Sequence, residues 1–220
     1  DRRTERILIE ELSRTRPGYG FLVEESGTIE GPDKTHRFII DPLDGTTNFL
    51  HSIPHFAISI ALEREGQIVS ALVYNPISDD LFIAEKGHGA YLNDKRLRVA
   101  ARKQLRDALS ATGIPFMGKD GHERFLGELA AVMAVSPGVR RFGSAALDLA
   151  YVAAGRYDAF WERGLQIWDI AAGVLLVREA GGVVSDLDGG ARMLESGNIL
   201  AANEALHPQF LKLIRQAEPR

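Results

Sequence analysis

Apolar and polar residues alternate along much of the first half of the chain, which is the pattern of half-buried β-strands. The segment 56–63 places Ile58, Ile60 and Leu62 on one face, and the segment 67–74 repeats the alternation with β-branched residues. Short strands joined by tight polar turns predict an antiparallel meander. The strands predicted in this half cover residues 21–23, 38–40, 56–63, 67–74, 80–85 and 90–92.

In the second half, apolar residues recur at the three- and four-residue spacing of helices that bury one face. Within 122–135, for example, Phe125, Leu129 and Val132 share a face. The helices predicted for the whole chain cover residues 2–14, 122–135, 144–155, 168–181 and 204–216, and further strands cover 157–161, 183–186 and 199–202. Interleaved strands and helices predict an α/β fold built in layers.

The change from strands to helices near residue 110 predicts two subdomains. Residues 1–110 would form an antiparallel sheet with helices, and residues 111–220 an α/β unit. Asp186 to Gly189, between the strands 183–186 and 199–202, is predicted to be a hairpin turn, because it lacks the length and ligands of a calcium loop.

The stretch 38–49 carries the most chemistry. A short apolar run ends at Asp41, and a second acid, Asp44, follows three residues later. Pro42 favours an extended Asp41, so both carboxylates are expected at the mouth of one strand. Acids this close repel unless protons or cations lie between them, and oxygen ligands suit Mg²⁺ or Mn²⁺, with the backbone carbonyl of Leu43 as a further ligand.

Directly after the two acids, Gly45-Thr46-Thr47 offers a sharp turn, backbone N–H groups and two hydroxyls. These groups can hold a phosphate at the start of a helix. The alternative is that Asp44-Gly45 is only a turn and that Thr46 only caps a helix. On the interpretation in which this turn binds phosphate, the metal site and the phosphate site are adjacent.

The nine residues from Asp41 to Phe49 resemble the signature of the inositol monophosphatase family, the Mg²⁺-dependent, Li⁺-sensitive sugar-phosphate phosphatases. The resemblance extends over essentially the whole chain. It includes Glu24-Glu25-Ser26, Gly143-Ser144-Ala145-Ala146 and Trp168-Asp169-Ile170-Ala171-Ala172-Gly173. It implies an alternating αβαβα sandwich, a homodimer, and two or three Mg²⁺ that activate a water for attack on a phosphate ester.

The resemblance also implies roles for individual residues. The implied metal ligands are Glu24, Asp41, the carbonyl of Leu43, Asp44 and Asp169. Thr46, oriented by Asp1, would position the attacking water together with Glu24, and Gly45, Thr46 and Thr47 would bind phosphate. The implied substrate contacts are Asp44, Gly143, Ser144, Ala145 and Glu162.

Three of these motifs also have a purely structural interpretation. Glu24 belongs to a pair of acids that a loop would simply expose to water. Ser144 is explained by capping a helix, and Asp169 by the favourable helix dipole in a first turn. The sequence alone leaves both interpretations open.

Composition narrows the class of protein. A net charge of −4 over 220 residues, with 45% apolar residues, suggests neither a nucleic-acid surface nor a basic membrane face. No apolar run reaches the roughly 18 residues of a membrane span, and no signal peptide is visible, so a cytoplasmic protein is expected. The absence of cysteine excludes disulfides and thiolate chemistry. Because the chain opens on Asp1, we expect preceding residues.

The resemblance implies hydrolysis of myo-inositol 1-phosphate, with fructose 1,6-bisphosphate or another sugar or nucleotide phosphate as the alternative. The loop from Pro115 to Gly121 is expected to take part in that choice. A different class of function is a regulatory protein that binds RNA or protein through the basic run of residues 95–106. Salt-sensitive RNA binding would favour it.

Overall fold

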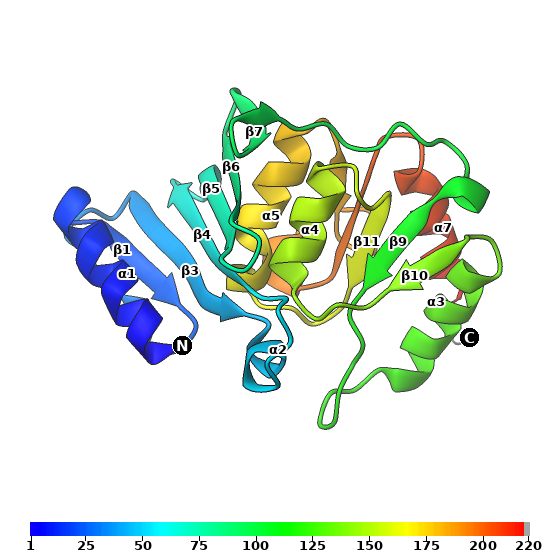
Figure 1. The fold of residues 1–220 in the computed structure, drawn as a ribbon, viewed down its shortest axis with the longest axis horizontal. Helices are drawn as coiled ribbons and strands as arrows, with labels where there is room; N and C mark the ends of the chain where they lie inside the picture. The colour runs from blue at the N-terminus through cyan, green and yellow to red at the C-terminus, as the bar shows by residue number, and fades with distance from the viewer. Residues whose placement is uncertain (218–220) are drawn as a thin grey trace.

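The computed structural model describes residues 1–217, which form five alternating layers (Figure 1). Helix α1 (Arg2–Thr15) covers the outer face of one sheet. Helices α4 (Ala145–Ala153) and α5 (Ile167–Glu179) lie between that sheet and a second one. Helices α3 (His122–Met133) and α7 (His207–Gln216) cover the far side. The predicted αβαβα sandwich is therefore confirmed.

The first sheet has eight strands in the order β2-β1-β3-β4-β5-β6-β7-β8. From β3 to β8 each strand is antiparallel to the next, which confirms the predicted meander, whereas β1 runs parallel to β3. The strands are β1 (Gly20–Val23), β2 (Gly27–Ile29), β3 (His36–Asp44), β4 (Ala57–Arg64), β5 (Gln67–Asn75), β6 (Asp80–Glu85), β7 (Gly89–Leu92) and β8 (Lys95–Arg96).

Strand β3 is buried on both faces, which explains why its sequence reads as a continuous apolar run. Phe38 and Ile40 pack into the core under α1, and Ile39 points the other way into the core around α4 and α5. The layer of helices on each side leaves no polar face along this strand.

The second sheet has the order β10-β9-β11-β13-β12. Strands β9 (Leu109–Thr112), β10 (Gly138–Arg140) and β11 (Ala159–Glu162) are parallel neighbours, and β13 (Ile199–Ala202) is antiparallel to β11 and β12 (Val183–Ser185). The sequence pattern missed β9 and β10, because Leu-Ser-Ala-Thr and Gly-Val-Arg contain fewer large apolar residues than the equally short strands β12 and β13. The division near residue 110 into two subdomains of one compact unit, the first carrying most of the metal ligands, stays a prediction.

The predicted turn at Asp186 to Gly189 is present, since the Gly189 N–H donates to the Asp186 carbonyl at 3.1 Å, but it does not by itself join the two strands as a tight hairpin. The connection from β12 to β13 is longer and includes the helix α6 (Met193–Ser196). The Asp186 carboxylate accepts hydrogen bonds from the backbone N–H groups of Asp188, Gly190 and Arg192. That carboxylate, and not a two-residue turn, organises the loop.

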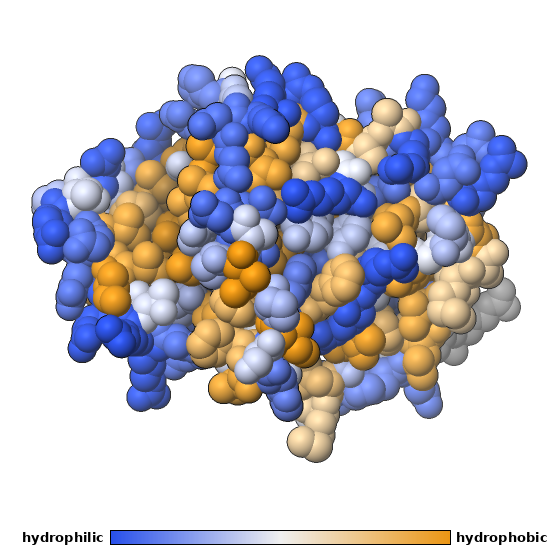
Figure 2. All heavy atoms as spheres, viewed as in Figure 1, coloured by the Kyte–Doolittle hydropathy of each residue, from blue (hydrophilic) through white to orange (hydrophobic). Residues whose placement is uncertain are grey.

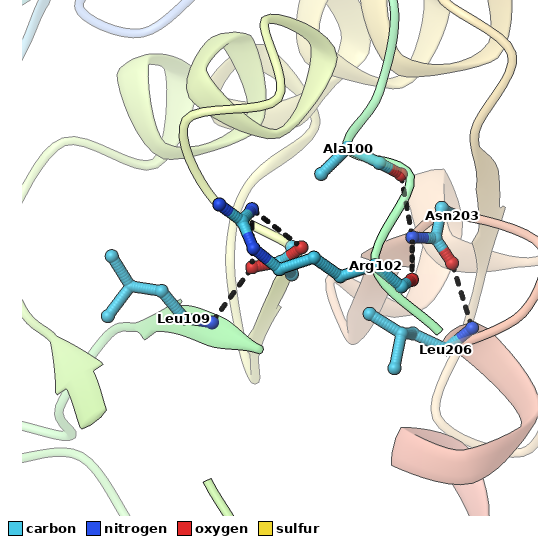
Figure 3. Close-up of polar contacts among 6 residues, drawn as sticks. Ala100, Arg102, Leu109, Asn203 and Leu206 are labelled. Carbon is cyan, nitrogen blue, oxygen red and sulfur yellow. Dashed lines mark hydrogen bonds and ion pairs between the residues drawn. The ribbon is translucent and has the colours of Figure 1, made fainter. Parts of the chain in front are cut away.

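The segment joining the two sheets, residues 97–108, is fastened to the second sheet by buried polar groups (Figure 3). It contains a short 3₁₀ helix, η1 (Leu105–Asp107). The Asn203 side-chain amide donates to the carbonyls of Ala100 and Arg102, at 2.7 and 2.8 Å. Asp158, which is 1% exposed, accepts from the Leu109 N–H and from the Arg102 guanidinium. Arg102 therefore stabilises the fold through its ion pair with Asp158.

The middle layer is the most apolar part of the protein. Residues 170–177 of α5 are all buried, and a side chain at Gly173 would collide with Leu149 of α4, so the two helices pack closely because this position is glycine. Despite this apolar character, no helix within residues 1–217 combines the length and hydrophobicity needed to cross a membrane.

Candidate active site

Two acids meet at one edge of the first sheet because β1 and β3 are parallel. Val23 pairs with Ile40, so Glu24 and Asp41, the next residues, emerge side by side. The Glu24 N–H donates to the Ile40 carbonyl at 3.3 Å, which keeps the two acids at the same end of the sheet. The sheet register thus accounts for this first pair.

The pairing of β3 with β4 is irregular between Asp41 and Asp44, which brings the second acid to the same place. Pro42 has no N–H to donate to a neighbouring strand. The Leu43 N–H donates instead to Oδ1 of Asp41 at 2.8 Å. The break in the ladder lets both carboxylates leave the strand at the same end.

The start of α4 holds Asp44 in place. Its Oδ2 accepts from the Ser144 hydroxyl at 2.5 Å and from the Ala146 N–H at 2.8 Å. The Leu147 N–H donates to Ser144 Oγ, so the predicted N-cap is confirmed. Ser144 is only 1% exposed, so its hydroxyl fixes a carboxylate and does not line an open surface.

Asp169 comes from the first turn of α5. Its carboxylate accepts from the Gln166 N–H at 2.7 Å, which completes a capping box. The Ser59 hydroxyl of β4 donates to the Trp168 carbonyl at 3.2 Å and ties the start of this helix to the first sheet. These contacts place the third acid against the pair from β3.

Asp41, Asp44 and Asp169 form a cluster in which each offers an oxygen, all within 4.8 Å of one another. Glu24 lies beside this group, because it follows Val23, which pairs with Ile40 directly before Asp41. An oxygen-only set of this kind suits a hard divalent cation such as Mg²⁺ or Mn²⁺. The four side chains come from three separate elements, and the fold brings them together as the resemblance implied.

The cluster is electrostatically unfavourable without a counter-charge. Burial, and then repulsion from Asp44 and Glu24, raises the pKa of Asp41 to about 10. Burial, and then repulsion from Asp169, raises the pKa of Asp44 to about 7 even though Ser144 and α4 oppose the shift. Burial also raises the pKa values of Asp169 and Glu24. A bound cation would favour the ionised forms of all four.

The turn after the two acids begins the short helix α2 (Thr46–Leu50). Gly45 has φ 99°, and a side chain there would press on the His55 and Gly143 carbonyls, so this position requires glycine. The Asn48 amide donates to the carbonyls of His55 and Phe142, at 2.8 and 2.6 Å. Asn48 thereby joins this turn to the loop that carries Gly143 and Ser144.

The predicted partnership of Asp1 and Thr46 is not among the hydrogen bonds of the described residues. The Thr46 hydroxyl donates to the Leu43 carbonyl at 3.0 Å, and Asp1 sits at the start of α1. A carbonyl oxygen has two lone pairs, so Leu43 keeps one for a metal ion. The role of Asp1 stays a prediction.

A cavity of about 520 Å³ opens beside the acid cluster, lined by Glu162 and Asp169 together with residues of the loop 113–121. The loop that the sequence associated with substrate choice therefore lies next to the acids. Lys119 of this loop donates to the Gly164 carbonyl at 3.0 Å. Burial, and then the charge of Asp44, raises the pKa of Glu162 to about 8, against the opposing effect of Arg141.

Another buried acid near this site escaped sequence reasoning. Asp148 is 1% exposed, and its Oδ1 has no hydrogen-bond partner. Burial, and then the charges of Glu162 and Asp44, raise its pKa well above the usual value. Its position in α4 marks it only as a helical residue, so nothing in the sequence revealed its neighbours.

Glu5 is a further acid that the sequence did not single out. Although it lies in the charged helix α1, it is only 3% exposed. One carboxylate oxygen accepts from the Glu25 N–H at 3.0 Å, and the other accepts from the Ser26 hydroxyl. Glu5 therefore fixes the turn that presents Glu24. The sequence feature that could have indicated this role is the four-residue spacing of Glu5 from Asp1, which puts both acids on one helix face.

Replacing Glu5 with alanine is expected to raise the Mg²⁺ concentration for half-maximal activity about 10-fold, because partners of metal ligands contribute that much to affinity. Glu5→Gln should restore much of the loss, since its amide can accept from Glu25 and donate to Ser26. Mg²⁺ titrations of both variants check this. Equal Mg²⁺ requirements in Glu5→Ala and the parent protein would contradict the positioning role.

The fold and site together define the class. A layered sandwich that gathers acidic side chains from strand ends and helix starts beside one cavity is suited to holding a metal ion next to a bound substrate. The chain belongs to the inositol monophosphatase family, whose model matches residues 1–218. The family and the phosphatase class expected from the sequence are thereby confirmed.

Individual relatives agree with this assignment. The chain is 60% identical over 216 residues to an inositol-1-monophosphatase of Mesorhizobium japonicum, covering 98% of this chain and 81% of the relative. It is 47% identical over 215 residues to Nus factor SuhB of Escherichia coli strain K12, covering 98% and 80%. The crystal structure of extragenic suppressor protein suhB from Bartonella henselae superimposes with a TM-score of 0.96 at 57% identity, covering 98% and 83%.

Proposed function

We propose that this protein is a Mg²⁺-dependent phosphomonoesterase that hydrolyses inositol monophosphate to inositol and phosphate. The observation that carries the proposal is the cluster of Asp41, Asp44 and Asp169 at the edge of a cavity that also contains Glu162. The similarity to a relative named inositol-1-monophosphatase supports the choice of substrate.

The residues present fit Mg²⁺. The donors are all oxygens, three of them converge within 4.8 Å, and their pKa values are raised in a way that a cation would reverse. Glu24, Asp41, Asp44, Asp169 and the Leu43 carbonyl would hold two or three ions, or Mn²⁺ in their place. When bound, such ions lower the pKa of a coordinated water and offset the charge that develops on the phosphate and the leaving oxygen.

The protein's own groups would position the substrate. Backbone N–H groups of Gly45, Thr46 and Thr47 would bind phosphate oxygens, and the Thr46 hydroxyl, with Asp1 and Glu24, would orient the attacking water. No covalent bond to the protein is required. The proposal follows the family resemblance here, and the left-handed turn at Gly45 supports it.

The inositol ring would lie in the cavity. The Glu162 carboxylate would accept hydrogen bonds from ring hydroxyls, and Asp44 would contact the same ring. Gly143 and Ala145 would approach it through their backbone. Ser144 would act through Asp44, since its hydroxyl is bonded to that carboxylate.

Phosphate release should be fastest with myo-inositol 1-phosphate when it is compared with fructose 1,6-bisphosphate and adenosine 3′,5′-bisphosphate. Each substrate is tested with Mg²⁺, with EDTA, and with Mg²⁺ plus Li⁺. EDTA should abolish release, and Li⁺ should inhibit it. A higher kcat/KM for either bisphosphate would leave the assignment of the site unchanged but contradict the proposed substrate. The protein would then be a fructose bisphosphatase or a nucleotide phosphatase.

We also propose a homodimer. Helix α2 exposes Phe49 and Leu50, which are 51% and 74% accessible, and the loop before α3 exposes Phe116 and Met117 at 63% and 94%. Figure 2 shows apolar residues along the lower edge of this face, where Figure 1 places α2. A molar mass of one chain in light scattering would exclude the homodimer.

The cytoplasmic location stays a prediction that cell fractionation would test.

A second candidate is a regulatory protein that binds RNA or protein, favoured by the similarity to a relative named Nus factor SuhB. Arg102 of the basic run is paired with the buried Asp158, so reversing its charge would disturb the fold. Lys103 and Arg106 are exposed and give a cleaner test. Salt-sensitive RNA binding that is lost in Lys103→Glu/Arg106→Glu would support this candidate. Binding that the double variant leaves unchanged would remove the basic run from consideration.

A further inference from the structure

Gly113 and Glu162 are brought together by two parallel strands. Thr112, the last residue of β9, pairs with Trp161 of β11, so the residues that follow each of them lie at the same edge of the sheet. The Thr112 hydroxyl donates to the Trp161 carbonyl at 2.8 Å and reinforces this register. Both Gly113 and Glu162 line the cavity beside the acid cluster.

The Glu162 carboxylate occupies the space that a side chain at Gly113 would need. A methyl carbon built on Gly113 would overlap the carboxyl carbon and both carboxylate oxygens of Glu162. The backbone does not explain the glycine, because Gly113 is not among the residues with positive φ. The Glu162 carboxylate therefore lies in the space that the absence of a side chain at Gly113 leaves free.

From this contact we propose that Gly113 is a specificity-determining position, which sets where the Glu162 carboxylate stands in the cavity. The inference rests on the proposed function, in which that carboxylate binds substrate hydroxyls. Gly113 is a positioning residue in this account, since it acts through Glu162 and contributes no reacting group.

A side chain at position 113 would move the carboxylate and leave the strands in place. Thr112 and Trp161 are 2% and 0% exposed and are hydrogen-bonded to each other, so the sheet has little room to shift. The end of a glutamate side chain moves at much lower cost, because it rotates about single bonds. The expected result of Gly113→Ala is an intact protein with a displaced Glu162.

The first test is a crystal structure of Gly113→Ala. The Glu162 carboxylate should be displaced while residues 109–112 and 159–161 superimpose on the parent structure. Gly138→Ala is a matched control, because Gly138 lies in the same sheet and also lacks a positive φ. A carboxylate that keeps its position, with the backbone at 112–113 moved instead, would overturn the proposal whatever the substrate is.

The second test is kinetic. In Gly113→Ala, kcat/KM for myo-inositol 1-phosphate should fall about 10- to 100-fold, mainly through KM, as expected when a hydrogen-bonding group is misplaced. Hydrolysis of p-nitrophenyl phosphate, which has no ring hydroxyls, should stay near the parent rate. In a Glu162→Ala background, Gly113→Ala should have little further effect.

Two outcomes separate the inference from the function on which it rests. Equal losses from Gly113→Ala with and without Glu162 would overturn the inference and leave the proposed function standing. Failure of the parent protein to prefer myo-inositol 1-phosphate over p-nitrophenyl phosphate would overturn the proposed substrate and the specificity role. The displaced carboxylate in the crystal structure would then still support the positioning of Glu162 by Gly113.

Discussion

Asp169→Asn is expected to lower kcat for Mg²⁺-dependent phosphate release about a thousand-fold or more, a loss of roughly 4 kcal/mol of transition-state stabilisation. The carboxylate is one of three that converge within 4.8 Å, and an amide is a much weaker ligand for a hard cation. The fold should survive, because the asparagine oxygen can still accept from the Gln166 N–H at the start of α5. Activity and thermal unfolding of the same preparation check both statements.

Asp186→Asn is a matched control for this substitution. Asp186 is 5% exposed and accepts three backbone hydrogen bonds, yet it serves the loop between β12 and β13. Its asparagine variant should lose some stability and keep its Mg²⁺-dependent kcat. Full Mg²⁺-dependent turnover in Asp169→Asn would remove this acid from the metal site.

The metal-free protein is expected to lose stability as the pH rises from 5 to 8. Asp44 and Asp41 titrate near 7 and near 10 in the fold, whereas unfolded aspartate titrates near 4. Between those values the folded state holds protons that the unfolded state has released, so stability falls as pH rises through the window. A loss of several kcal/mol is expected, because each of these carboxyl groups contributes about 1.4 kcal/mol per pH unit below its pKa in the fold, and this corresponds to a Tm lower by about 10 °C or more.

Mg²⁺ should reverse this loss, with a larger increase in Tm at pH 8 than at pH 5, because a cation favours the ionised carboxylates. Asp41→Asn should raise the Tm of the metal-free protein at pH 8 and should abolish the stabilisation by Mg²⁺. Asp148→Asn is the control for the Mg²⁺ effect, because it also removes a buried acid with a raised pKa and should raise the Tm at pH 8, but it lies outside the cluster and should keep the stabilisation by Mg²⁺. A metal-free protein that becomes more stable from pH 5 to pH 8 would contradict the repulsive cluster.

The layered fold was predictable where strands and helices were long enough to show a period. The alternation in residues 56–63 and 67–74 led directly to β4 and β5, and Ser144 correctly marked the start of α4. Strands β9 and β10 were missed because their residues include few large apolar side chains, whereas the equally short β12 and β13 were predicted. At Asp186 the turn was found but the long loop that continues from it was not, since that loop is held by a side chain that accepts from three backbone N–H groups.

The acids of the candidate site were predictable because a family signature spans them, and the structure brings Asp41, Asp44 and Asp169 together. The groups that support them were not predictable from local sequence. Glu5 looks like a surface glutamate of a charged helix until the turn at Glu25 and Ser26 is packed on it. Gly113 is unremarkable in sequence, and only the register of β9 and β11 places Glu162 on it.

The measurement that tests the central claim most directly is phosphate release from myo-inositol 1-phosphate by the metal-free protein as Mg²⁺ is added. The account predicts no release before addition, saturable activation by Mg²⁺, and complete loss on adding EDTA. Release that is unchanged by EDTA, or no release at any Mg²⁺ concentration, would contradict the assignment of the acid cluster to a Mg²⁺-dependent inositol monophosphatase site.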